Sequence, residues 1–113
     1  MKKNGLLTLL FTLAITATAW AQDPNALKSQ ANNQVVTASQ LMERARAVLQ
    51  QSPNPAGRNA AIAILVEAGQ MFEQSAGIYQ ALMPKYATQQ DVDNARKAMQ
   101  SCVQQIQQLQ QGQ

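Results

Sequence analysis

Apolar and small side chains recur along this chain at alternating steps of three and four residues, in three separate stretches. The first stretch contains Ala31, Val35, Ala38, Met42, Ala45 and Leu49. Such steps place the residues on one stripe of an α-helix. Asp23 can cap the first turn, and Pro24 suits the first helical position because its missing N–H would have no partner there. Pro53 stops the pattern, which predicts a helix over about residues 24–51.

The second stretch carries two such stripes side by side. One contains Ile62, Leu65, Gly69, Phe72, Ala76, Tyr79 and Met83, and the other contains Ala61, Ile64, Ala68, Met71, Ser75, Ile78 and Leu82. Together they form an apolar arc wider than one neighbouring helix can cover. The pattern predicts a helix over about residues 59–83, capped by Asn54 or Asn59 after a linker rich in proline. We expect this helix at the centre of the fold, touching both neighbours or another molecule.

The third stretch begins with a capping-box pattern, Thr88 followed three residues later by Asp91. Its stripe contains Val92, Ala95, Met99, Cys102, Ile106 and Leu109. The pattern predicts a helix over about residues 89–111. No comparable stretch alternates with a period of two, so we expect no sheet. The predicted fold is all-α, a three-helix up-down-up bundle, with an extended or oligomeric coiled coil as the alternative.

An export signal precedes these helices. Residues 1–21 combine Lys2 and Lys3, an apolar run over residues 6–15, and a small-x-small ending at Ala21. We expect cleavage after Ala21, or alternatively after Ala19, which leaves residues 22–113 as a single helical domain. An uncleaved membrane anchor is the competing interpretation. No cysteine lies near either cleavage site, so we expect no lipid anchor. The predicted location is the periplasm or the outside of the cell, with membrane contact only during export.

The charge balance argues against nucleic acid as a partner. Without Lys2 and Lys3, seven basic residues stand against six acidic ones, which leaves a net charge of +1. No basic run remains, and the aromatic side chains after the signal are Phe72, Tyr79 and Tyr86. A nucleic-acid surface usually combines a basic stripe with aromatic rings that stack on bases. We therefore expect no nucleic-acid binding.

Histidine is absent from the whole sequence. Its absence removes Ser-His and Cys-His catalysis, the commonest metal ligand and the usual axial ligand of haem. We therefore expect no enzyme, no catalytic residue, no cofactor and no metal site. Cys102 is the single cysteine and lies on an apolar stripe, which is typical of a small buried core residue. An intermolecular disulfide across a two-fold pairing of the third helix is the alternative.

A small, alanine-rich core beside a wide apolar arc favours a protein that associates. We expect a non-catalytic exported helical protein that acts by protein–protein interaction in the bacterial cell envelope. The candidate interaction face is Ile64, Met71, Ile78 and Leu82; the groove between the first and third helices is the other candidate. A structural homo-oligomer, such as a coiled-coil spacer or filament subunit, is the alternative. A membrane-surface protein is less favoured, because residues 60–83 carry no Lys or Arg. A carrier of a small apolar ligand is also less favoured, because nothing in the spacing indicates a ligand.

Overall fold

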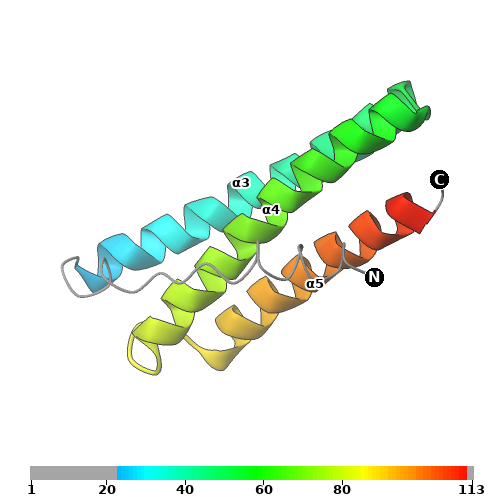
Figure 1. The fold of residues 1–113 in the computed structure, drawn as a ribbon. Coiled ribbons are helices and arrows are strands. Elements are labelled where there is room, and N and C mark those ends of the chain that lie inside the picture. Colours follow the sequence, from blue (N-terminus) through cyan, green and yellow to red (C-terminus); the bar gives the residue numbers. More distant parts are fainter. Residues whose placement is uncertain (1–22, 112–113) are drawn as a thin grey trace.

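The computed structural model describes residues 23–111, which form three α-helices and no strand. The helices are α3 (Pro24–Gln51), α4 (Pro55–Leu82) and α5 (Gln89–Gln111). Successive helices run in opposite directions, and α4 lies between the other two (Figure 1). The all-α prediction is confirmed for this part of the chain. The predicted export signal, residues 1–21, lies outside the described residues.

Local side-chain chemistry starts α3 and α5. The Asp23 carboxylate accepts a hydrogen bond from the Ala26 N–H at 3.3 Å, and Pro24 occupies the first turn. At α5, the Thr88 hydroxyl accepts from the Asp91 N–H at 3.2 Å, while the Asp91 carboxylate accepts from the Thr88 N–H at 3.0 Å. This reciprocal pair satisfies two N–H groups that would otherwise lack partners. The capping box expected from the sequence is therefore present.

The start of α4 differs from the prediction. The helix begins at Pro55, four residues before the predicted start at residue 59. Asn54, one of the two caps expected from the sequence, is the cap, and its side-chain oxygen accepts a hydrogen bond from the Gly57 N–H at 2.8 Å. A proline that follows a capping asparagine sits at the first helical position, where its missing N–H would have no intrahelical partner. Two prolines in close sequence therefore mark a linker of only three residues, 52–54.

The linker is tight enough to need a glycine in the first turn of α4. A Cβ atom at Gly57 would lie 1.7 Å from the Ser52 carbonyl oxygen. Ser52 is itself held in place, because its N–H donates to the Val48 carbonyl oxygen at 2.8 Å. Gly57 thus lets α4 begin directly against the end of α3.

Small residues pack α3 closely against α4. Every seventh position on the facing stripes is small and at most 1% exposed: Ala31, Ala38 and Ala45 on α3, and Ala61, Ala68 and Ser75 on α4. The Ser75 hydroxyl lies 3.2 Å from the Ala31 carbonyl oxygen, which indicates the antiparallel register. In this register Ala38 lies opposite Ala68. Opposed small residues permit a short distance between the two helix axes.

Bulkier side chains fill the space between α4 and α5. Phe72 of α4 lies in one core cluster with Cys102 and Ile106 of α5. Val92 and Ala95 of α5 belong to a second cluster near the other end of α4. Both outer helices pack against α4, whereas α3 and α5 barely touch each other. The two apolar stripes of α4 are therefore covered within the chain, one mainly by α3 and the other mainly by α5.

Candidate functional site

A cleft lies where α3 and α5 flank α4 without meeting. It has a volume of about 220 Å³. Its lining comes from all three helices: Val35 and Ser39 of α3, Phe72 and Tyr79 of α4, and Asp91, Asn94, Ala95 and Ala98 of α5. We call this feature the α3–α5 cleft. Its position matches the groove between the first and third helices that the sequence offered as one candidate surface.

The floor of the α3–α5 cleft is aromatic. Phe72 and Tyr79 are seven residues apart on α4, and they are 2% and 5% exposed. The Tyr79 hydroxyl donates a hydrogen bond to the Asn32 side-chain oxygen on α3. This bond ties the floor to one wall and fixes the orientation of the tyrosine ring. Burial raises the pKa of Tyr79, and the nearby Asp91 carboxylate raises it further.

The rim of the α3–α5 cleft is polar. Ser39 and Asn94 contribute neutral polar side chains from opposite walls, and Asp91 is the one charged residue in the lining. One carboxylate oxygen of Asp91 accepts the Thr88 N–H of the capping box. The other has no hydrogen-bond partner among residues 23–111. The cleft thus combines an apolar interior with a carboxylate at its edge.

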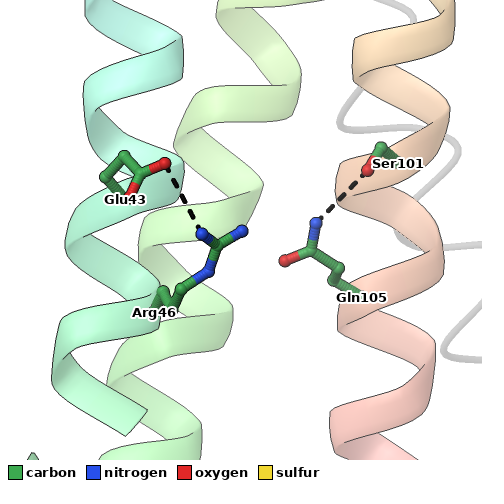
Figure 2. A network of polar contacts seen from close by, with 4 residues as sticks. All are labelled: Glu43, Arg46, Ser101 and Gln105. Carbon is green, nitrogen blue, oxygen red and sulfur yellow. Dashed lines mark hydrogen bonds and ion pairs between the residues drawn. The ribbon is translucent and has the colours of Figure 1, made fainter. Parts of the chain in front are cut away.

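Beyond the cleft, toward the linker between α3 and α4, the described residues of α3 and α5 are not joined to each other. Figure 2 shows the Arg46 side chain of α3 and the Gln105 side chain of α5 extending toward each other across α4. Each is held on its own helix: Arg46 lies 3.6 Å from Glu43, and Gln105 donates to the Ser101 hydroxyl at 3.2 Å. Within the described part of the chain, no hydrogen bond or ion pair joins α3 to α5. The outer helices are thus not joined to each other by a described polar contact.

The face predicted to bind a partner lies mostly against α3. Ile78 and Leu82 are 2% and 7% exposed, in a cluster with Leu27 and Ala31 of α3. Ile64 is half-buried against the other cluster. Met71, also half-buried, lines a shallow hollow of about 440 Å³ beside α3. Contact of this face with a partner stays a prediction, and the surface that a partner could reach there is reduced to Ile64 and Met71.

Cys102 lies at the centre of the core. It is a free thiol and 0% exposed, packed with Phe72 and Ile106. Burial raises the pKa of the Cys102 thiol to about 11. A disulfide between two copies would require α5 to leave α4 first. The placement of the thiol accords with core packing, the first of the two roles expected from the sequence.

Sequence reasoning missed three cleft residues: Ser39, Asn94 and Ala98. Each lies beside an apolar stripe rather than on it, because the stripes mark positions that face the core. The helical spacing does place Asp91, Asn94 and Ala98 along one side of α5. This spacing identifies these residues as part of a cleft only when the position of α3 on the opposite side is known.

Within residues 23–111, no group of three or more His, Cys, Asp or Glu side chains lies close enough to hold a metal ion. No described helix has the combination of length and apolar character that a membrane span needs. Comparison with known proteins gave no match to a protein-family model, to a curated protein or to a solved structure. Function must therefore be argued from the geometry of the chain itself.

Proposed function

We propose that this chain is a small non-catalytic protein of the bacterial cell envelope that binds a helix of another protein in the α3–α5 cleft. The observation that carries the proposal is a cleft lined by all three helices, in which α3 and α5 barely touch each other above the buried rings of Phe72 and Tyr79. An amphipathic helix buries its apolar face in grooves of this kind. In solution the three helices would form an up-down-up bundle that is open along one side, and the partner would supply the fourth helix.

Two features of the chain support a binding role rather than catalysis. The sequence has no histidine, and Asp91 is the lone carboxylate in the lining of the cleft. Acid–base chemistry by paired carboxylates needs a second carboxylate positioned against the first. Export is supported by the charged, apolar and small-residue segments in residues 1–21. Mass spectrometry of the exported fraction should give a chain that starts at Gln22; retention of the intact chain in the membrane would contradict export.

Cross-linking in cells tests the binding role. A photoreactive amino acid placed at Ser39, on the wall of the cleft, should give an adduct with a different protein. Ala98→Trp should abolish this adduct, because the indole fills the cleft from the opposite wall. Ala63→Trp is the matched control, since Ala63 is exposed on α4 and does not line the cleft. Circular dichroism verifies that both variants are folded.

Two results would contradict the proposed role. An adduct that survives Ala98→Trp would place the contact outside the cleft. An adduct with twice the mass of the chain would show that the cleft receives a second copy, which is the structural homo-oligomer expected as the alternative.

A further inference from the structure

The geometry points to a specific feature of the bound helix: a lysine side chain on its apolar face that enters the α3–α5 cleft and pairs with Asp91. This inference rests on the proposed function, because it names the chemistry of the helix that the cleft would bind. It follows from the composition of the lining, the unpaired carboxylate and the length of the two walls.

The lining has the chemistry of an alkylammonium site. Val35, Phe72, Ala95 and Ala98 offer apolar contact, and Asp91 offers a negative charge at the edge. A lysine side chain places a four-carbon apolar stem behind a positive head, so both parts of the lining would be satisfied. The volume of about 220 Å³ accommodates a side chain of this size.

No cation of the described chain already occupies this position. The Arg96 guanidinium of α5 donates to the Gln80 side chain at 2.7 Å, and Lys97 is exposed. The one ion pair within residues 23–111 joins Arg46 to Glu43. Asp91 therefore keeps one carboxylate oxygen available to a donor from outside residues 23–111. A charge-assisted hydrogen bond to this oxygen would be stronger than a neutral one.

The aromatic floor also favours a positive charge. The faces of phenylalanine and tyrosine rings attract a cation placed within about 6 Å of the ring centre. Phe72 and Tyr79 both line the cleft, and the electrostatic influence of Asp91 reaches the Tyr79 hydroxyl. Carboxylate and rings thus act on the same small volume.

The length of the walls favours a helix over a free amine as the source of the ammonium group. From Val35 to Arg46 and from Asp91 to Gln105, the walls run for about 16 Å and 21 Å at 1.5 Å per helical residue. A helix of three to four turns has a matching length, whereas a free amine would fill the cavity of about 220 Å³ alone.

Peptide titration tests the inference. The probes are four 18-residue amphipathic helical peptides with the same leucine and alanine stripe. One carries lysine in the middle of the stripe, two carry glutamine or glutamate there, and one carries the lysine on its polar face. We expect the first peptide to bind the full-length protein at least tenfold more tightly than the other three. The fourth peptide has the same net charge as the first, which separates a specific contact from general attraction.

Two carboxylate variants complete the experiment. Asp91→Asn keeps an oxygen for the capping box and should remove the preference for the first peptide. Asp93→Asn is the matched control, because it removes the same charge from an exposed position of the same helix. Ala98→Trp should weaken all binding to the cleft.

Each alternative result has a definite meaning. Equal binding of the four peptides, or none at all, would overturn lysine recognition, while helix binding itself is decided by the Ser39 cross-link. A preference that survives Asp91→Asn would also overturn it. Binding of n-butylamine as tight as that of the first peptide would show a small-amine site and overturn the helix as the source.

Discussion

Single residues at the α3–α4 hairpin differ sharply in the room that they leave for a side chain. Gly57 would place an added Cβ atom 1.7 Å from the Ser52 carbonyl oxygen, whereas Gly77 has no neighbouring atom within 4 Å of the same position. Both glycines lie in α4, and neither has a positive φ. They therefore form a natural pair in which one methyl group has opposite effects.

Gly57→Ala should destabilise the protein, and Gly77→Ala should stabilise it. The first change forces the backbone of the linker to move, with an expected loss of about 1–3 kcal/mol. The second removes chain entropy from the unfolded state, with an expected gain of about 0.4–1 kcal/mol. Urea denaturation followed by circular dichroism measures both. A Gly57→Ala protein as stable as the parent would show that the hairpin is looser than described.

The Cys102 thiol should make stability fall at high pH. Its pKa is about 11 in the folded chain because of burial, against an ordinary value of 9.0. The unfolded chain therefore loses the proton first as pH rises. The contribution is fully present below about pH 9 and is lost as pH rises toward about 11. Urea denaturation across this range measures it.

Cys102→Ala isolates the contribution of the thiol from that of Tyr79, whose pKa is also raised. The variant should show a smaller decrease in stability between pH 9 and pH 11 than the parent protein. An identical decrease in both proteins would mean that the thiol is not buried in the folded state.

At the scale of the helices, the packing of α3 on α4 depends on opposed small residues. Ala38 is 0% exposed and lies opposite Ala68. Ala38→Leu should force the two helices apart and cost about 1–3 kcal/mol. In a domain of this size, each kcal/mol lowers the Tm by about 4–8 °C. Ala47→Leu, at an exposed position of the same helix, is the control and should leave the Tm nearly unchanged.

The helices themselves could be predicted because their signals are local. The stripes and the caps at Asp23 and Thr88 depend on residues within a few positions of one another. The start of α4 differs from the predicted residue 59 for a local reason too, because Pro55 lies in a proline-rich segment that predicts a linker and yet forms the first turn of the helix. Where one residue separates two prolines, the start of the helix can be assigned only once the capping geometry of that residue is known.

The cleft could not be predicted in detail because it depends on distances between helices. An apolar stripe shows that a residue is covered without showing by which neighbour. Ile78 and Leu82 illustrate this, since α3 of the same chain covers positions that the sequence assigned to a partner. The separation of α3 from α5 depends on how each helix packs on α4, which no single stripe reveals.

For the molecule as a whole, most apolar surface is used within one chain. The two stripes of α4 have partners in α3 and α5. Among residues 23–111, Val36 is the one large apolar side chain that is mainly exposed, at 55%. The wide apolar arc of α4 predicts self-association, but α3 and α5 of the same chain cover most of that arc. The α3–α5 cleft remains as the apolar surface available to a different protein.

Sedimentation equilibrium of residues 22–113, with and without reductant, tests most directly whether the cleft is left free for a different protein. We expect a monomer in both conditions, because the apolar arc is covered internally and the Cys102 thiol is buried. A monomer leaves the cleft free for a partner helix. A concentration-dependent dimer that Ala98→Trp abolishes would contradict this, since the cleft would then be occupied by a second copy of the chain.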